Sequence, residues 1–442
     1  MEVKKILEQA GKDDIKFITL QFTDLLGVIK ELIIPVEQLE DASRNGVWFD
    51  GSSVEGFARI QESDLFLKPD MATYAVVPWL TENGKTARLI CDIYRSDGEP
   101  FQGDPRFILK QAAAEAAKEG FDYNVGPEPE FYLFRVDDEN RTSPIDFGSY
   151  FDLSSHEGYK AIKEIIAALE NFGIKVETSH HEVGFGQYEI DFHYGSCLDI
   201  ADKVVTLKYC AKKIAQVHNM HATFMPKPIM DAAGSGMHIH QSLFDIKTKK
   251  NSFYDKDHKY NLSKAAFSFI AGQIKHINAM CAVLCPTVNS YKRLVSGFEA
   301  PVYVTWAAMN RSALLRVPKW FKAKQEAARI ELRCPDPACN PYLAFAVMLK
   351  AGLDGIKNNL APPGPVEENI YTLDDESLVK KNIGVLPTSL REALNELKKD
   401  KLIQEVLGEH LFERYIDIKT KEWDEFKKQV TNWEIDMYLD TF

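Results

Sequence analysis

Three absences narrow the class of protein before any motif is considered. We expect no secretory leader, because the charged start at Met1–Lys5 runs into an amphipathic segment, and no apolar stretch long enough to span a membrane. It also has no excess of basic residues: 53 Lys and Arg against 65 Asp and Glu give a net charge of −12. Nucleic acid or an anionic membrane surface would demand a basic face. We therefore expect a cytoplasmic protein whose partners are neither nucleic acid nor membrane.

A cysteine framework is the third feature that the sequence lacks. Its seven cysteines are an odd number without the spacing of a zinc site, so we expect reduced thiols. Cys281 and Cys285 lie one helical turn apart in an apolar segment, where core packing is the simpler explanation. Carboxylates and histidines are therefore the metal ligands to consider.

The chain is long enough for two or three domains, with 442 residues of which 45% are hydrophobic. Residues 15–35 read as a β-hairpin that turns at Asp24–Gly27, and further strands are expected at 72–77 and 87–93. The segment 95–103 is rich in turn residues. We expect a domain boundary there, with an N-terminal domain at residues 1–103 and a catalytic domain at 104–442.

The second domain alternates helices with strands. Asp104 and Pro105 form a helix start, and Gly120 ends that helix. Amphipathic periodicity predicts the further helices 155–171, 198–219, 262–284 and 340–357, and a helical region after the proline-rich loop 361–365. The pattern predicts an α+β fold.

Four strand candidates carry charged side chains at alternate positions. They are Glu128–Phe131, Glu189–Phe192, His238–His240 and Arg329–Arg333. Because side chains alternate along a strand, each pair of charged residues would share one face while the intervening apolar residues point the other way. Taken singly, each stretch is equally well an ordinary antiparallel strand with one solvated face. If all four belong to one curved sheet, its concave side would suit metal ions and phosphate.

The residue types on these strands restrict the metal. Many carboxylates with few histidines favour Mg²⁺ or Mn²⁺ over zinc. The candidates suffice for two ions that keep water and phosphate oxygens as their remaining ligands. They are Glu128, Glu130, Glu182, Glu189, His238 and Glu331.

Ordered motifs along nearly the whole chain resemble those of the glutamine synthetase family. The segment Lys227–Ser242 is a glycine-containing loop that leads into the histidine-bearing strand, and it resembles the family's nucleotide-binding signature. Phe49–Ser53 resembles the N-terminal signature. Further matches, in order, are Gly126–Phe131, His180–Glu189, Lys292–Pro301, Asn310–Ser312, Arg329–Arg333, Pro335–Pro337 and Asn340–Tyr342. The length resembles the shorter subclass of the type I enzymes, which is not controlled by adenylylation.

The resemblance implies a fold and a reaction. Its fold would be a small N-terminal β-grasp-like domain followed by a larger catalytic domain with a curved antiparallel sheet flanked by helices. The implied reaction joins ammonia to L-glutamate with ATP through a γ-glutamyl phosphate. Glu130, Glu182 and Glu189 would hold the metal that faces the substrate, whereas Glu128, His238 and Glu331 would hold the metal that orients the ATP phosphates.

The resemblance also assigns the arginines and the glycine loop. Arg293 would hold the substrate α-carboxylate, and Gly234 would contact the substrate. Arg311 and Arg333 would face the transferred phosphoryl group, because guanidinium groups bind its oxygens in pairs. Arg316 and Arg329, with His240 and Ser242, would contact the nucleotide. For each arginine taken alone, a surface ion pair is an equally good explanation.

Two acids are implied to act on ammonia and to close the site. Asp50 would bind ammonium and remove a proton, and Glu299 would lie on a flap that shields the acyl phosphate from water. A turn residue before Gly51 is the alternative for Asp50. In the resembling enzymes the Asp50 loop reaches the active site of a neighbouring subunit, which implies a dodecamer of two hexameric rings.

Some positions leave alternatives open. Ala233 stands where the family often has asparagine, so a γ-glutamyl ligase that uses a polyamine or another amine remains a rival. A non-catalytic nitrogen-sensing or structural relative is the rival of another class, and the complete set of metal ligands argues against it. Tyr371 falls where one subclass is nucleotidylated, but the shorter subclass usually lacks that control and an exposed loop tyrosine is the preferred interpretation. The sequence leaves open feedback by glutamine through Arg59 or activation by 2-oxoglutarate.

Overall fold

The computed structural model describes residues 3–54, 56, 63–81, 83–295, 297, 300–320, 324–368, 370, 375–381 and 383–442. Three of the residues considered above, Arg59, Glu299 and Tyr371, lie outside the described residues.

The N-terminal part forms a six-stranded sheet with two helices. The strand order is β2-β1-β6-β4-β3, with β5 paired to β6. Its elements are α1 (Val3–Lys12), β1 (Ile15–Thr23), β2 (Ile29–Pro35), α2 (Leu39–Asn45), β3 (Val47–Asp50), β4 (Asp64–Pro69), β5 (Ala75–Val76) and β6 (Lys85–Arg95). The expected hairpin of β1 and β2 is confirmed. Asp24 fixes its turn by accepting hydrogen bonds from the amides of Leu26 and Val28, and Gly27 supplies the positive φ of 79°.

The strand expected at 72–77 is largely wrong. Asp70 accepts a hydrogen bond from the Ala72 amide, and the chain forms a short 3₁₀ turn at Met71–Thr73 before the two-residue strand β5. A capping carboxylate outweighs the β propensity of this stretch. The strand expected at 87–93 is confirmed within β6.

The predicted helices of the larger part are confirmed. They are α3 (Pro105–Lys118), α4 (His156–Asn171), α5 (Cys197–Val217), α6 (Lys264–Leu284) and α8 (Pro341–Lys357). Asp104 begins α3 by accepting from the Arg106 amide. The remaining helices are α7 (Ser290–Arg293), α9 (Asp375–Lys380), α10 (Leu390–Leu397), α11 (Lys401–Leu407), α12 (Glu409–Phe426) and α13 (Asn432–Tyr438).

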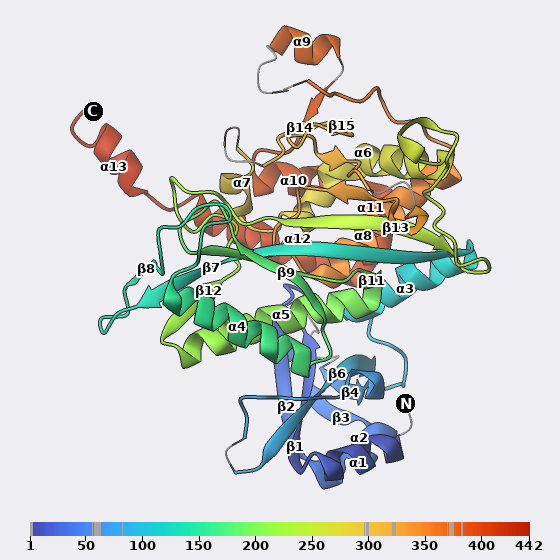
Figure 1. Ribbon diagram of the computed structural model, residues 1–442, viewed down its shortest axis with the longest axis vertical. Coiled ribbons are helices and arrows are strands. Elements are labelled where there is room, and N and C mark those ends of the chain that lie inside the picture. The colour runs from blue at the N-terminus through green and yellow to red at the C-terminus, as the bar shows by residue number, and fades with distance from the viewer. Residues whose placement is uncertain are drawn as a thin grey trace.

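One ten-stranded sheet contains all four charged strands. Its order is β15-β16-β17-β13-β7-β10-β9, with β8, β11 and β12 also paired to β7. The strands are β7 (Phe121–Val136), β8 (Thr142–Pro144), β9 (Val176–His181), β10 (Gln187–Phe192), β11 (Gly195–Ser196), β12 (Met220–Thr223), β13 (Met237–Asp245), β15 (Trp306–Ala307), β16 (Leu315–Arg316) and β17 (Ile330–Leu332). All described pairs in it are antiparallel except β15 with β16, while β14 (Tyr303–Val304) and β18 (Gly384–Val385) form a separate pair. Figure 1 shows α4 and α5 between this sheet and the N-terminal sheet.

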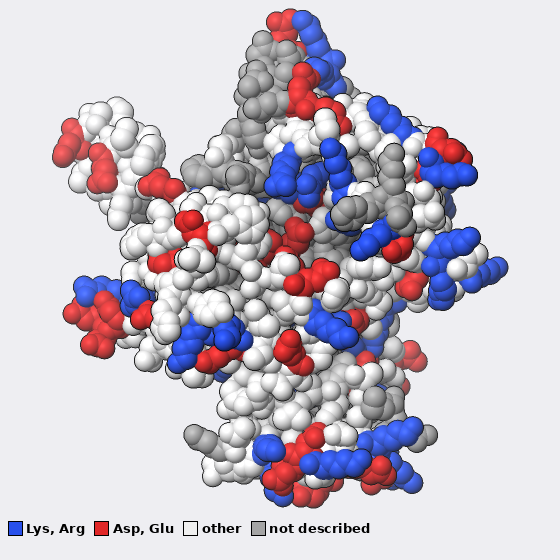
Figure 2. All heavy atoms as spheres, in the orientation of Figure 1, with Lys and Arg blue, Asp and Glu red and all other residues white. Residues whose placement is uncertain are grey.

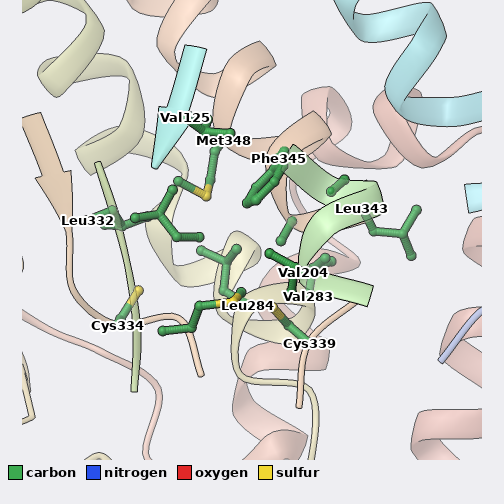
Figure 3. Close-up of a cluster of buried hydrophobic side chains, with 14 of the residues drawn as sticks. Val125, Val204, Val283, Leu284, Leu332, Cys334, Cys339, Leu343, Phe345 and Met348 are labelled. Atoms are coloured by element: carbon green, nitrogen blue, oxygen red, sulfur yellow. The ribbon is translucent and has the colours of Figure 1, made fainter. Parts of the chain in front are cut away.

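The main core lies under the sheet, where β7, β13 and β17 meet α5, α6 and α8. Figure 3 shows Val125, Leu332, Leu284 and Met348 converging there from four of these elements, and all are at most 1% exposed. Helices α6 and α8 pack closely because their crossing is lined by glycine. A Cβ on Gly355 would lie 1.9 Å from the Ser268 carbonyl oxygen.

Helix α6 corrects one expectation from the sequence. Its 21 residues are long and apolar enough to cross a membrane, yet 78% of the apolar window is buried inside the protein. It is therefore placed as a core helix. On the face drawn in Figure 2, basic side chains occur in small groups beside acidic ones rather than as one broad basic surface.

A buried arginine joins the two parts of the chain. Arg106, at the start of α3, is 3% exposed and pairs with Asp70 and Asp92 of the N-terminal part and with Asp202 of α5. If the N-terminal sheet moved away, Arg106 and its aspartates would lose their partners and remain as uncompensated buried charges. The cluster therefore holds the N-terminal sheet against α3 and α5.

We predict a pH-dependent loss of stability in the variant His276→Gln. His276 of α6 lies 2.6 Å from Asp400 and 3.1 Å from Asp354, which Lys275 also contacts. Burial alone would lower the pKa of His276, but its hydrogen bonds to both aspartates outweigh burial and raise it. A raised histidine pKa stabilises the fold at pH values below the ordinary value of about 6.5 and loses that effect as the pH rises through the folded value.

The variant should therefore lower the thermal midpoint by a few degrees at pH 6, corresponding to about 1–3 kcal/mol, and by less at pH 9. His218→Gln is the matched control, because the Glu164 partner of His218 is partly exposed. An equal loss at both pH values for His276→Gln would contradict the account.

Candidate active site

Strand register brings the charged residues onto one face of the large sheet. Glu130 of β7 lies opposite Glu189 of β10, and Glu128 lies opposite His238 of β13. These residues border a cavity of about 370 Å³. Its walls are Glu128, Glu130, Tyr150, Glu182, Val183, Glu189, Ala233, Gly234, Gly236, His238, Arg293, Arg311, Arg316 and Arg333. Five of the six candidate metal ligands therefore line one cavity, and the sixth, Glu331, is fully buried beside it.

The first candidate ligand group is Glu130, Glu182 and Glu189. Glu182 Oε1 lies 2.9 Å from His180 Nε2, which is 3.8 Å from Glu189 Oε1. Burial, reinforced by the charge of Glu182, raises the pKa of Glu130 to about 8, and burial together with Asp191 raises that of Glu189. Crowded buried acids need either protons or a cation to balance them. An oxygen-rich group of this kind fits a hard divalent ion.

The second candidate group surrounds Glu331. His238 Nδ1 lies 3.6 Å from Glu128 Oε2 and 3.9 Å from Glu331 Oε1, whereas His240 Nε2 lies 2.7 Å from Glu128 Oε1. The structure thus brings both histidines to Glu128, although the sequence pointed only to His238 as a ligand. Burial, with the charge of Arg333, lowers the pKa of His238 to about 4, so its ring is neutral near pH 7, as a metal ligand must be. This mixed group also fits a hard divalent ion.

Positive charge meets the acids at Glu331. Burial would raise the pKa of Glu331, but the charges of Arg333 and His240 outweigh it and hold the pKa at about 2. Its carboxylate accepts hydrogen bonds from Arg333 Nη1 at 2.5 Å and from Arg316 Nε. Arg333 Nε is buried and has no hydrogen-bond partner among the described residues. Arg333 itself lines the cavity, and a guanidinium at a cavity wall is suited to phosphoryl oxygens.

Glycines in the loop before β13 allow Arg293 to lie against the backbone. A Cβ on Gly234 would lie 2.7 Å from Arg293 Cγ, and one on Gly236 would lie 2.5 Å from Arg293 Nη2. Arg293 is 3% exposed, and its guanidinium donates to the carbonyl oxygens of Cys334 at 2.7 Å and Arg333 at 3.1 Å. These contacts hold Arg293 in one orientation at the cavity wall.

A second cavity of about 400 Å³ adjoins the first at Glu128, which lines both. Its walls include the expected nucleotide residues His240, Ser242 and Arg329. Arg316, the fourth, lines the first cavity instead. Tyr194 also lines the second cavity, is 54% exposed, and lies across from Gly126. An exposed ring of this kind offers a stacking surface for a base.

The sequence did not point to Tyr150 or Tyr194. Tyr150 lies in the loop after β8, and its ring packs edge-on against His180 at 5.4 Å. Neither tyrosine belongs to an alternating charged strand, so periodicity carried no signal for them. Their shared property, a ring at a cavity wall, appears only in the folded chain.

Asp50 lies in the N-terminal part, outside the described walls of both cavities. Its carboxylate accepts from the Ser52 amide at 2.9 Å and from the hydroxyls of Ser52 and Ser53 at 2.6 and 3.0 Å. These hydrogen bonds lower the pKa of Asp50, so the side chain is an exposed anion. Within one chain Asp50 therefore has the turn-capping role that was its alternative explanation.

One cavity carries carboxylates suited to metal ions, and the adjoining cavity has the size of a nucleotide. Together with the arginines in their walls, they define a site for phosphoryl transfer. Comparison with known proteins gives the family. The chain matches "Glutamine synthetase, beta-Grasp domain" over residues 14–96 and "Glutamine synthetase, catalytic domain" over residues 102–438. The chain belongs to the glutamine synthetase family.

Curated relatives agree over nearly the full length. A glutamine synthetase of Methanosarcina mazei is 51% identical over 98% of this chain and 97% of the relative, and one of Clostridium saccharobutylicum is 49% identical over 99% and 98%. Among solved structures, Plasmodium falciparum glutamine synthetase superposes with a TM-score of 0.88 at 28% identity over 99% of both chains. A GmaS–ADP complex superposes with a TM-score of 0.88 at 32% identity over 98% of this chain and 99% of that one.

The expected α+β fold, with a β-grasp domain before the catalytic domain, is confirmed. The protein is an enzyme that forms glutamine from L-glutamate and ammonia with ATP, as expected from the sequence.

We predict that divalent metal stabilises the protein through Glu130. Addition of Mn²⁺ to the EDTA-treated protein should raise the thermal midpoint, because a ligand at 100 times its Kd adds about 2.7 kcal/mol per site. Glu130→Gln should lose a large part of this shift without loss of metal-free stability, since the variant removes one of three crowded acids. Glu139→Gln, an exposed acid in the turn after β7, is the control. An unchanged Mn²⁺ shift in Glu130→Gln would contradict the assignment.

Proposed function

We propose that the two adjoining cavities are the two halves of one active site. Glutamate and the transferred phosphoryl group occupy the cavity lined by acids and arginines, and the nucleotide occupies the cavity lined by Tyr194 and Ser242. The observation that carries this proposal is the shared wall at Glu128, because a γ-phosphoryl group must pass from one cavity to the other.

The ions are Mg²⁺ or Mn²⁺, two per active site. Glu130, Glu182 and Glu189 hold one, and Glu128, His238 and Glu331 hold the other. Bound there, the ions supply charge neutralisation on both sides of the transferred phosphoryl group. The support is the oxygen-rich ligand set and the neutral ring of His238.

The arginines bind and orient the two substrates. Arg293, held by backbone carbonyls, binds the α-carboxylate of glutamate, with Gly234 and Arg311 beside it. Arg311 and Arg333 contact the transferred phosphoryl group, and the unpartnered Nε of Arg333 supports this role. Arg316 and Arg329, together with His240 and Ser242, bind the nucleotide phosphates and sugar while Tyr194 stacks on the base.

Asp50 acts on ammonia from a neighbouring subunit. Its carboxylate binds ammonium and accepts a proton, which leaves ammonia to attack the γ-glutamyl phosphate. Glu299, which lies outside the described residues, would shield that intermediate from water. The position of Asp50 outside the described cavity walls of its own chain supports a shared site.

The enzyme is a homododecamer of two hexameric rings. Besides the placement of Asp50, the C-terminal arm supports an assembly, since Figure 1 shows α13 projecting from the body. Large apolar side chains on this arm are exposed, namely Val430, Trp433, Ile435, Met437, Tyr438, Leu439 and Phe442. Such a surface needs cover from another chain.

The protein belongs to the shorter, non-adenylylated type I subclass and works in the cytoplasm. Its length supports the subclass. We place the domain boundary between residues 103 and 104, where the turn-rich segment meets the Asp104 helix cap.

Ammonium should be the preferred acceptor. We expect purified enzyme with ATP, Mg²⁺ and glutamate to release phosphate and form glutamine when ammonium is added, and to release little with methylamine or a polyamine. Glu331→Ala should lower turnover by at least about a hundredfold, because it removes a metal ligand and unpairs two arginines. If phosphate were released only with another amine, the enzyme would be a γ-glutamyl ligase for that amine rather than for ammonia. Ala233 would then be the first residue to examine.

Mixed oligomers test whether Asp50 acts across a subunit interface. Asp50→Ala and Glu331→Ala should each be nearly inactive, because each destroys a different half of every site. When the two variants are dissociated and reassembled together in equal amounts, the mixture should recover about one quarter of the parental activity. Each site then has a one-in-two chance of an intact Asp50 and an independent one-in-two chance of an intact Glu331. Each variant reassembled alone is the control. Activity that stays at the control level in the mixture would place both residues in one chain's site.

A further inference from the structure

Asp146 connects three segments next to the acid-lined cavity. It follows β8, and its side chain is 11% exposed. Its carboxylate accepts hydrogen bonds from His181 Nε2 at 2.8 Å, the Gly186 amide at 3.1 Å, the Gly148 amide at 3.4 Å, the Tyr188 hydroxyl at 2.7 Å and the Ser155 amide at 3.4 Å. So many donors on one buried carboxylate indicate a fixed local structure.

His181 extends this network to the candidate metal ligand Glu182. Its side chain is fully buried, and its Nδ1 lies 2.6 Å from the Glu182 carbonyl oxygen while its Nε2 lies 2.8 Å from Asp146 Oδ1. Alternation along β9 places His181 on the opposite face from His180, whose Nε2 lies 2.9 Å from Glu182 Oε1. The imidazole therefore holds the backbone of Glu182 from behind the site.

The same network holds the loop that carries Tyr150. Gly148 lies so close to the ring of His181 that a Cβ there would be 2.8 Å from Nε2. Beyond it, the rings of Tyr150 and Phe151 pack on His180 at 5.4 and 4.7 Å. Asp146 therefore connects the loop that carries Tyr150 with the turn that carries Glu182, and both of these residues line the cavity.

We propose that Asp146 and His181 are a pair of positioning residues that set the carboxylate of Glu182 for metal binding and hold Tyr150 at the cavity. The inference rests on the proposed role of Glu182 as a metal ligand. Neither residue is among the described walls of the two cavities. Partners behind metal ligands fix the ligand's direction, and their loss weakens metal binding without unfolding the site.

The test measures Mn²⁺ and ADP binding separately. Asp146→Asn and His181→Gln should each raise the Kd for Mn²⁺, measured by calorimetry on the assembled protein, by about tenfold to a hundredfold. The Kd for ADP, whose cavity lies beyond Glu128, should change by less than about threefold in the same variants. In the steady state, the variants should lose kcat at saturating glutamate and recover part of it at high Mn²⁺.

Two controls separate positioning from general stability. Tyr188→Phe removes one buried hydrogen bond to Asp146 but leaves the path from Asp146 through His181 to Glu182, so it should keep the parental Mn²⁺ affinity. Asp137→Asn removes a carboxylate that caps an exposed turn through the Glu139 and Arg141 amides, and should change neither Kd. If Asp146→Asn does not assemble, His181→Gln provides the same measurement.

The outcomes distinguish this inference from the proposed function. Weakened Mn²⁺ binding in Glu182→Gln, Asp146→Asn and His181→Gln, with ADP binding retained, is the expected result. Parental Mn²⁺ affinity in Asp146→Asn and His181→Gln beside weak binding in Glu182→Gln would overturn the positioning role alone. Parental Mn²⁺ affinity in Glu182→Gln would overturn the ligand assignment on which the inference rests.

Discussion

The crowding of carboxylates on one face of the large sheet is the constraint on which the site depends. Glu130 of β7, Glu182 in the turn after β9 and Glu189 of β10 come together in a largely buried place, and burial raises the pKa of Glu130 to about 8. Such a cluster is costly unless cations share it. The destabilisation caused by these buried carboxylates has a use in phosphoryl transfer. Cations that the carboxylates bind neutralise the negative charge of the transferred phosphoryl group.

The surrounding structure resists this repulsion through rigid supports. Strand β7 runs for 16 residues through the middle of the sheet and fixes the register of both ligand groups against β10 and β13. Opposite charge is held as firmly: Arg316 and Arg333 pair with Glu331, while backbone carbonyls hold Arg293. His181, which contacts Asp146, also contacts the backbone carbonyl oxygen of Glu182 and so supports that residue from outside the cavity. Arg106 then pairs with the N-terminal sheet, whose Asp50 is not among the described wall residues of the two cavities.

Periodicity predicted the regular elements and the acids because both follow local rules. Because alternate positions on a strand share a face, the sequence alone placed Glu128 and Glu130 on the same face of one strand. The helices α3 to α6 and α8 could be predicted from their caps and amphipathic spacing. The strand expected at 72–77 was predicted too long: only β5 (Ala75–Val76) forms, because the Asp70 cap favours a 3₁₀ turn just before it. Tyr150, Tyr194 and Asp146 could not be predicted, because their positions depend on contacts between segments far apart in the chain. The motifs assigned Arg316 to the nucleotide, but its place in the wall of the acid-lined cavity became visible only in three dimensions.

The central claim is that two ions occupy two defined ligand groups. Anomalous diffraction at the manganese edge, from crystals of the assembled enzyme grown with Mn²⁺ and ADP, tests it most directly. The account predicts two peaks in each chain, one among Glu130, Glu182 and Glu189 and the other among Glu128, His238 and Glu331. A single peak, or peaks that none of these carboxylates contacts, would contradict it.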